Sequence, residues 1–397
     1  MNIELIESGA KKNIRAGMRH SIPYGRQWID EEDIEAVVEV LRSDWLTTGP
    51  KVGEFEKEFA RFTGAREAVA VSSGTAALHS IMHAIGVSPG DEIIMPPITF
   101  VATANAIVFQ GGKPVFADVD METLLLDPEE VKTKITPRTK AVVAVDYAGQ
   151  PCNYDALRAI TDRYGIILIA DACHSLGARY KGGKVGTLAD LTAFSFHPVK
   201  HITTGEGGMI TTDNPILAER MRVFRNHGII TDHRQREEQG SWRYEMVDLG
   251  YNYRITDFQC ALGVSQLNKL PKWLARREEI ARIYDAAFEA FPYVKPLSVS
   301  KDVFHAYHLY VVRIQDTEPS KNREAVFKCL RGKGIGVNVH YLPVHLHPFY
   351  KKRFHTDAGL CPVAEQAYDD ILSLPMFPKL KSHEQEYVIK TIKDIWS

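Results

Sequence analysis

Lys200 has the surroundings that a reactive amine requires. It lies in the segment FSFHPVKHITTGEGGMI, in which Phe194, Phe196, Val199 and Ile202 surround it and a glycine-rich turn follows. A lysine that forms a Schiff base must attack as the neutral amine, and a desolvated site lowers its pKa toward that form. Most lysines are instead solvated surface charges. The apolar setting therefore makes Lys200 a candidate nucleophile.

A carboxylate follows the apolar run IILIA of the segment IILIADACHSLG. If this run is a buried strand, Asp171 stands at its carboxyl end, which is where ligands bind in open α/β sheets. An acid at that place can pair with a pyridinium nitrogen and keep the ring an electron sink. Asp171 can equally be the N-cap of a following helix, and the sequence leaves both readings open. His174 lies about one turn further and can contact the same ring, whereas Cys173 reads as a packing residue.

The segment VSSGTAAL has the pattern of an anion site. A strand ends at Ser72-Ser73, Gly74 allows close approach of a ligand to the backbone, and a helix begins with free N–H groups. An ordinary strand-to-helix turn capped by Ser or Thr has the same pattern. A further segment, LGYNYRITDFQCALG, places Asn252 and Arg254 before a helix that starts at Thr256-Asp257.

The elements that must position these residues alternate along the first two thirds of the chain. Apolar periodicity predicts helices, and short apolar or β-rich runs predict strands. The expected helices are 30–43, 52–64, 75–86, 99–111 and 154–165, and the expected strands are 68–73, 91–97, 114–120, 141–149 and 166–172. Alternation of this kind predicts an α/β fold with a mostly parallel sheet covered on both faces.

The character of the chain changes beyond Leu270. We expect a long helix over 270–291, a strand over 308–314, a helix over 323–334, a strand over 335–343 and a closing helix over 383–396. The predicted organisation is a polar N-terminal leader (1–22), a large domain (23–270) and a small α+β C-terminal domain (271–397). A chain of 397 residues exceeds one ordinary core, which agrees with two domains.

Composition narrows the class of protein. The formal net charge is −2 and no block of like charge occurs, which gives no support to a nucleic-acid or membrane-surface role. Five scattered cysteines without a C-x-x-C pair indicate reduced thiols rather than disulfides or a zinc site. The N-terminus lacks a signal-peptide core and no run of 18 apolar residues occurs, so we expect a cytoplasmic protein.

Taken in order, the motifs resemble the DegT/DnrJ/StrS family of sugar aminotransferases. The matching segments are SSGTAAL, TFVATANAI, DACHSLG, SFHPVK-x-ITTGEGG, GYNYR-x-TD-x-QCALG and VHY-x-P, and the resemblance runs from about Pro23 to the C-terminus. It implies the aspartate-aminotransferase-like fold type I and pyridoxal 5'-phosphate (PLP) as cofactor. Lys200 then matches the Schiff-base lysine that also moves the proton, and Asp171 matches the acid on the pyridine nitrogen. Ser195, Gly74 and Thr75 match phosphate ligands.

The resemblance assigns three further residues to the cofactor. Phe100 matches the aromatic residue that stacks on the ring, where many relatives have Trp. His174 occupies a position that is often Gln, near the ring hydroxyl. Asn252 matches a residue that reaches the phosphate from the neighbouring subunit, which implies a homodimer with shared sites. Because Lys200 is retained, the resemblance favours the aminotransferases over the dehydratase branch of the family, which has His at this position.

Substrate expectations come from the same resemblance. AVDYAGQP, FSFHPVKHITTGEGG and RVFRNHGI resemble the pseudaminic-acid branch, in which L-glutamate donates the amino group to C4 of a UDP-linked 4-keto-6-deoxy-N-acetylamino sugar. Another dTDP- or UDP-linked keto sugar, or a non-catalytic regulatory relative, is the alternative. Arg254, His340 and Tyr341 are the candidate substrate residues. The histidines of VHYLPVHLHPFY match no metal-binding pattern, so no metal is expected.

Overall fold

The computed structural model of the chain describes residues 21–231, 234, 236, 240–316 and 318–397. Most of the leader predicted over 1–22 therefore lies outside the described residues. Of its last two positions, Ile22 is buried and forms a bridge with Ile335.

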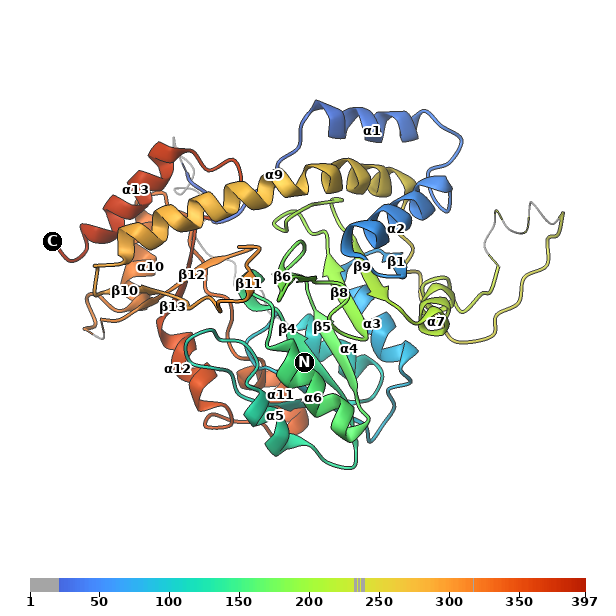
Figure 1. Cartoon of the computed structure of the whole chain (residues 1–397), viewed down its shortest axis with the longest axis horizontal. Coiled ribbons are helices and arrows are strands. Elements are labelled where there is room, and N and C mark those ends of the chain that lie inside the picture. The colour runs from blue at the N-terminus through green and yellow to red at the C-terminus, as the bar shows by residue number, and fades with distance from the viewer. Residues whose placement is uncertain (1–20, 232–233, 235, 237–239, 317) are drawn as a thin grey trace, which may run out of the picture.

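A seven-stranded sheet with strand order β1-β9-β8-β5-β4-β2-β3 forms the centre of the larger part of the molecule (Figure 1). All pairs are parallel except those of β9, which runs antiparallel to both neighbours. The prediction of a mostly parallel sheet is confirmed. The strands are β1 (Glu67–Val71), β2 (Glu92–Met95), β3 (Lys113–Phe116), β4 (Thr139–Val145), β5 (Ile167–Asp171), β8 (Leu191–Ser195) and β9 (Gly208–Thr212).

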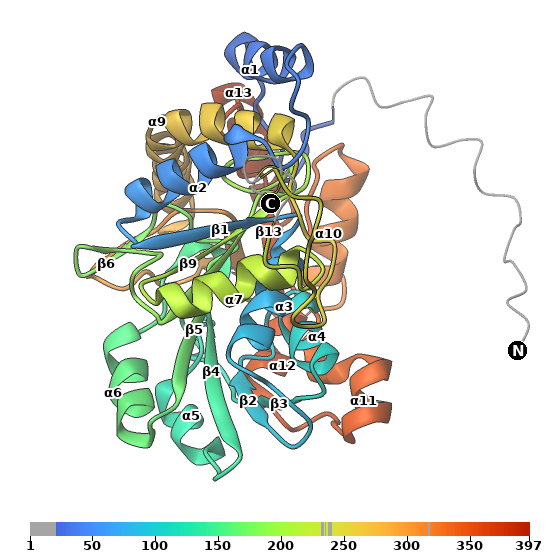
Figure 2. The ribbon, with the colours of Figure 1, turned by 90° about the vertical axis from the view of Figure 1, so that its right-hand side faces the viewer.

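Helices cover both faces of this sheet, as expected for buried, continuously apolar strands. In Figure 2 the strands β2, β4 and β5 lie between α5 and α6 on one side and α3 and α4 on the other. The helices of this part are α1 (Glu31–Leu41), α2 (Pro50–Thr63), α3 (Gly74–Ala84), α4 (Ala102–Phe109), α5 (Pro128–Lys134), α6 (Tyr154–Tyr164) and α7 (Pro215–Arg225), with the 3-10 turn η1 (Tyr147–Gly149).

The long helix α9 (Asp257–Phe288) links the two parts of the molecule along one side (Figure 1). It begins at the N-cap Thr256, as predicted, where Gln259 completes a capping box. Leu270, at which we placed a domain boundary, lies inside this helix. Leu274 still packs in the core of the larger part, whereas Ile280 belongs to the core of the smaller part.

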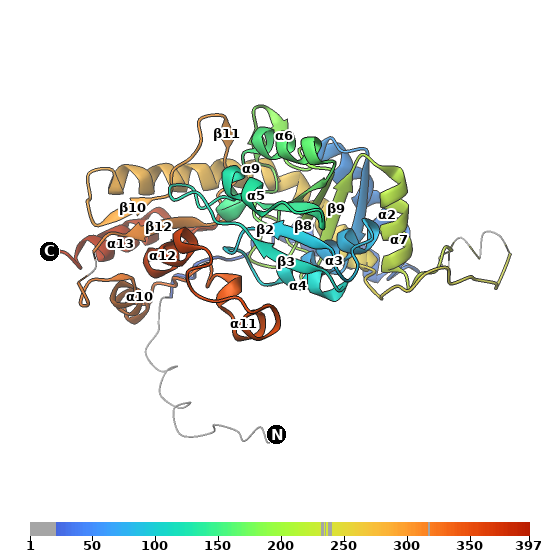
Figure 3. The ribbon, with the colours of Figure 1, turned by 90° about the horizontal axis from the view of Figure 1, so that it is seen from below.

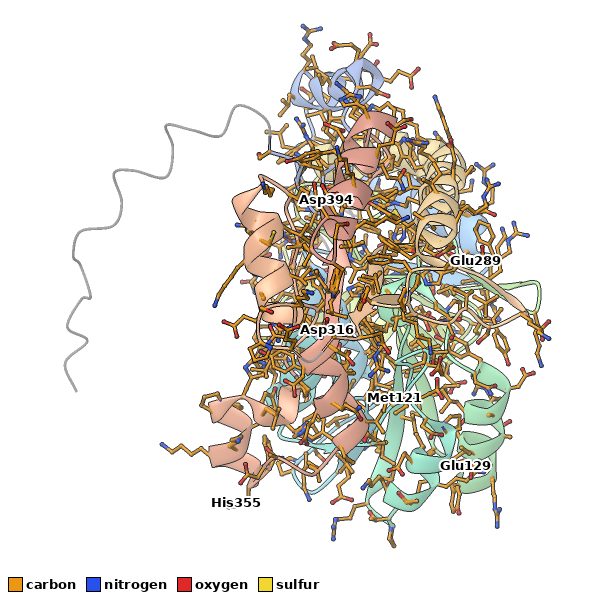
Figure 4. The ribbon with its side chains drawn as sticks, turned by 90° about the vertical axis from the view of Figure 1, so that its left-hand side faces the viewer. Met121, Glu129, Glu289, Asp316, His355 and Asp394 are labelled. Atoms are coloured by element: carbon orange, nitrogen blue, oxygen red, sulfur yellow. The ribbon has the colours of Figure 1, made fainter. Side chains whose placement is uncertain are left out.

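The smaller part is built on an antiparallel sheet of β10 (Val294–Pro296), β12 (Tyr310–Ile314) and β13 (Ile371–Leu374). The helices of this segment are α10 (Arg323–Gly332), α11 (Pro348–Phe354), α12 (Pro362–Asp370) and α13 (Ser382–Lys393), with the 3-10 turn η2 (Val344–Leu346). The Trp396 indole donates to Asp316 at 2.9 Å, which ties the residues after α13 to the loop after β12. Figure 4 labels Asp316 and Asp394, the C-cap residue of α13.

The strand predicted over 335–343 is wrong. This segment makes only two isolated bridges, Ile22 with Ile335 and Asn338 with Ser373. β13 has β12 on one side and a free edge on the other, but the segment pairs with this free edge only at the bridge between Asn338 and Ser373. It runs past β13 instead and enters the site described below. The remaining strands, β6 (Arg179–Tyr180), β7 (Gly183–Lys184) and β11 (Val303–Phe304), form a small separate sheet.

Candidate active site

The carboxyl end of β5 carries Asp171 into a nearly closed site. The side chain is 6% exposed, and its carboxylate accepts hydrogen bonds from the Thr103 hydroxyl at 2.7 Å and the Cys173 N–H at 3.2 Å. Asp171 is not a helix N-cap, because no helix begins after it. Thr103 of α4 was missed in the sequence analysis. Its local sequence carries no distinct signal, because the segment TFVATANAI contains two further polar residues, Thr99 and Asn105.

Lys200 lies in the connection between β8 and β9. This connection contains no helix, so β9 can return beside β8 in the antiparallel direction and the lysine is held in a tight turn next to the strand ends. The Lys200 N–H donates to the His197 carbonyl at 2.9 Å. Burial lowers the pKa of Lys200, and the nearby Cys173 and Asp171 oppose that shift. The direction of the shift favours the neutral amine that a nucleophilic lysine requires.

The first turn of α3 and the end of β8 form a cradle for an anion. Ser73 is the N-cap and accepts from the Ala76 N–H at 3.1 Å, and the first N–H groups of a helix have no partner within it. A Cβ atom on Gly74 would lie 2.9 Å from Cβ of Ser195 and 3.3 Å from Sγ of Cys173. Only glycine therefore lets Ser195 approach the helix N-terminus, where Gly74 and Thr75 begin α3. These groups fit a phosphate.

His174 brings a second segment into the site. Its Nε2 lies 3.2 Å from the Tyr341 hydroxyl, and its buried Nδ1 has no hydrogen-bond partner in the structure. Burial lowers the pKa of His174 well below its usual value, so the imidazole is neutral. The Phe100 ring lies 6.1 Å from that of Tyr341 and is 58% exposed, which leaves it free to cover a ligand. An unpartnered buried nitrogen beside a free aromatic ring suits a planar polar ligand.

His340 is buried beside this group. Its Nδ1 lies 2.8 Å from the Ser373 hydroxyl and its Nε2 lies 3.2 Å from Nδ2 of Asn338. Burial, with a contribution from Lys200, lowers the pKa of His340 to about 3. Its carbonyl accepts a hydrogen bond from the Tyr147 hydroxyl.

Asn252 and Arg254 do not belong to the group of side chains around Lys200 and Asp171. Among the described residues, the structure gives neither side chain a contact with Lys200 or Asp171 of the same protomer. Asn252 is exposed, and its backbone forms a bridge with Asn226. The Arg254 guanidinium donates to Oδ1 of Asn226 at 3.0 Å and lines a separate cavity of about 250 Å³.

Two buried groups next to the site were also missed in the sequence analysis. Asp146, at the end of β4, accepts from the Ser175 hydroxyl at 2.6 Å and the Tyr154 hydroxyl at 2.9 Å, and its N–H donates to the Asp171 carbonyl. Burial raises the pKa of Asp146 to about 7 despite these donors. The His308 ring lies 4.3 Å from that of His174. Asp146 had the same local signal as Asp171, an acid directly after the apolar run AVVAV, whereas His308 had no such signal.

Among the described residues, no group of three or more His, Cys, Asp or Glu side chains is arranged to hold a metal ion. Within the same described ranges, no helix combines the length and apolar character needed to cross a membrane.

Comparisons with known proteins show the family of the chain. Residues 27–393 match the model of the DegT/DnrJ/EryC1/StrS aminotransferase family. The spore coat polysaccharide biosynthesis protein SpsC of Bacillus subtilis is 43% identical over 378 residues, which cover 95% of this chain and 97% of SpsC.

Two solved structures give the same fold. A putative sugar aminotransferase from Streptococcus pneumoniae, in its PLP form, superposes with a TM-score of 0.89 at 33% identity and covers 95% of this chain and 98% of that one. PseC of Helicobacter pylori, an aminotransferase involved in the biosynthesis of pseudoaminic acid, has a TM-score of 0.89 at 33% identity and covers 95% and 99%. The chain therefore belongs to the DegT/DnrJ/EryC1/StrS family and is a PLP-dependent sugar aminotransferase of fold type I.

Proposed function

We propose that Lys200 is the residue that links PLP covalently and moves the proton during transamination. One observation carries this proposal. The amine of Lys200, whose pKa is lowered by burial, lies near Asp171 and Cys173, and Cys173 borders the cradle at the start of α3. Gly74, Thr75 and Ser195 would hold the phosphate of the cofactor. Asp171 would pair with its ring nitrogen.

Two further residues complete the proposed cofactor site. The exposed Phe100 ring would stack on the cofactor, and the unpartnered Nδ1 of His174 would approach the ring hydroxyl. Tyr341 would orient His174 through the 3.2 Å contact between its hydroxyl and Nε2.

The chain's own residues supply proton transfer and orientation. Bound PLP supplies an electron sink for the carbon that loses a proton. Lys200 Nζ, as a neutral amine, takes the proton from Cα of the amino donor, and as the ammonium it returns a proton to carbon. The Asp171 carboxylate holds a proton on the ring nitrogen, and its two hydrogen bonds fix the carboxylate for that role.

The proposed substrates are L-glutamate as donor and a UDP-linked 4-keto-6-deoxy-N-acetylamino sugar as acceptor, aminated at C4. The similarity to PseC supports this acceptor. Another UDP- or dTDP-linked keto sugar is the second candidate, and the 43% identity to SpsC, a protein of spore coat polysaccharide biosynthesis, favours it. Arg254, His340 and Tyr341 are the proposed substrate residues.

We further propose a cytoplasmic homodimer with shared active sites. Residues 229–231 and 240–251 belong to a segment whose described parts extend away from the body of the protomer beyond α7 (Figures 1 and 3). Its described part exposes large apolar side chains, among them Trp242 at 89%, Leu249 at 69% and Met246 at 63%. Apolar surface of this size is typical of a protein interface. Asn252, at the base of this segment, would reach the phosphate bound by the partner subunit.

The decisive experiment traps the cofactor on its lysine. Protein loaded with PLP is reduced with borohydride and digested, and mass spectrometry locates the modified residue. We expect the pyridoxyl group on Lys200 and no modification or visible absorbance in Lys200→Ala. Modification of another lysine would refute the assignment. Transamination of a panel of UDP- and dTDP-linked keto sugars, with product configuration read by NMR, then decides between the two acceptors.

A further inference from the structure

His79 is a buried histidine in the middle of α3, away from the cofactor cradle at the start of that helix. Its side chain is 1% exposed. Nδ1 lies 3.0 Å from the Tyr253 hydroxyl, and Nε2 lies 2.8 Å from Nε2 of Gln110. The rings around it belong to Phe109, Phe224, Tyr251 and Tyr253.

The hydrogen bonds assign one tautomer to this imidazole. Burial lowers the pKa of His79 to about 4, so the ring is neutral at physiological pH. The amide nitrogen of Gln110 can only donate, so Nε2 of His79 accepts. The proton is therefore on Nδ1, which donates to the Tyr253 hydroxyl.

Tyr253 belongs to an extended segment in which alternate side chains face opposite sides. The Tyr253 N–H donates to the Arg225 carbonyl, and its carbonyl accepts from the Ser72 N–H at 2.8 Å, just before the cradle. The rings of Tyr251 and Tyr253 are stacked at 5.1 Å and both contact His79. Asn252, between them, is directed to the other side, where it is exposed.

We propose that His79 is a positioning residue for the active site of the partner subunit. Through Tyr253 it fixes the segment that presents Asn252 and Arg254 across the dimer interface, while the first turn of the same helix serves the subunit's own cofactor. Loss of the hydrogen bond would therefore impair the other subunit's site rather than its own. The inference rests on the shared-site homodimer proposed above, and it makes α3 a direct link between the two sites.

The test uses two differently tagged heterodimers, each with one functional Lys200. In the first, Lys200→Ala and His79→Leu are on one subunit and the other is wild type, so the working site receives Asn252 from the His79→Leu subunit. In the second, the two substitutions are on different subunits, so the working site receives Asn252 from a subunit with intact His79. The reference is a heterodimer of Lys200→Ala and wild type.

We expect kcat/KM to fall about three- to tenfold in the first heterodimer, the loss typical of one buried hydrogen bond. The second should stay within about twofold of the reference, since its working site keeps an intact presenting segment. Equal losses in both, or a loss confined to the second, would overturn the proposal and show that His79 acts within its own subunit. Tyr253→Phe, which removes only the hydroxyl, should reproduce the pattern if His79→Leu folds poorly.

Two measurements test whether the loss of activity in the first heterodimer comes from the missing hydrogen bond between His79 and Tyr253. His79→Asn keeps a hydrogen-bond donor near the Nδ1 position, and we expect it to restore most of the activity in the first heterodimer. The dissociation constant of PLP, read from the visible absorbance at the intact Lys200, should rise in the first heterodimer and not in the second. This binding measurement decides the role of His79 even if no sugar in the panel is aminated, an outcome that would contradict only the proposed substrates.

Discussion

At the scale of single residues, the site depends on carboxylates that are fixed by hydrogen-bond donors. Asp171 accepts hydrogen bonds from a hydroxyl and a backbone N–H, which together fix the orientation of its carboxylate. Asp146 follows the neighbouring strand β4, and its backbone N–H donates to the Asp171 carbonyl. Substitution of Asp171 should affect catalysis, whereas substitution of Asp146 should affect the stability of the fold.

Asp171→Asn should remove catalysis and leave the fold intact. Its amide oxygen can accept from the Cys173 N–H and its amide nitrogen can donate to the Thr103 hydroxyl, but a neutral amide cannot hold a proton on the ring nitrogen. We expect kcat to fall by about 10²- to 10⁴-fold, measured as 2-oxoglutarate formation from glutamate. The melting temperature should change little. A turnover close to that of the wild type would show that Asp171 does not contact the ring.

Asp146 should make stability depend on pH. Its pKa in the folded protein is about 7 against an ordinary value of 3.8, so the folded state binds more protons than the unfolded chain between those pH values. Stability is therefore lost as pH rises through this window. In Asp146→Asn the amide can donate to Ser175 and accept from Tyr154, without a buried charge. We expect the variant to melt several degrees above wild type at pH 8.

The comparison at lower pH serves as the control for this prediction. At pH 5 the Asp146 carboxyl is protonated in the wild-type protein, so the difference in melting temperature should shrink toward zero. A difference that stays constant between pH 5 and pH 8 would mean that Asp146 does not titrate in this range.

At the scale of elements, the close approach of α3 to β8 decides whether the phosphate can be held. Gly74→Ala would place a Cβ atom 2.9 Å from Cβ of Ser195, so one of the two elements must move. Overpacking of this kind costs about 1–3 kcal/mol. We expect the dissociation constant of PLP to rise about tenfold or more, measured by absorbance titration.

Gly53→Ala is the matched control for the cradle glycine. Gly53 is an exposed glycine inside α2, and a Cβ atom there meets nothing within 4 Å. The substitution should leave PLP affinity unchanged and stabilise the protein by up to about 1 kcal/mol through the helix propensity of alanine. Equal PLP affinity in the two variants would argue against the cradle.

At the scale of the whole molecule, assembly should depend on the segment that projects beyond α7 (Figure 3). Met246→Glu together with Leu249→Glu places two charges on side chains that are 63% and 69% exposed in the protomer. If these side chains are buried in a dimer, unpaired carboxylates there cost several kcal/mol. We expect monomers by light scattering and loss of the visible absorbance of bound PLP.

Tyr164→Glu is the corresponding control on another surface. Tyr164 is 48% exposed and ends α6, a helix that lies apart from the projecting segment (Figure 1). Its substitution should change neither mass nor cofactor binding. A double Glu variant that remains dimeric and active would contradict the proposed interface.

The sequence by itself determined the elements whose signals are local. The apolar run that ends at Asp171, the Ser-Gly-Thr turn at Gly74 and the capped start of α9 were all predicted before the fold was known, because strand burial, helix initiation and capping depend on a few adjacent residues. Lys200 was singled out by its apolar neighbours, and the order of motifs indicated the family.

Only the tertiary structure decided which residues meet. Thr103 reaches Asp171 across 68 positions, and Tyr341 reaches His174 across 167. The segment 335–343 reads as a strand because its apolar residues are appropriate for one, yet it pairs with the edge strand β13 at a single bridge, Asn338 with Ser373. Pairing and side-chain contact depend on which surfaces compete for burial, and that competition involves the whole chain rather than a local window.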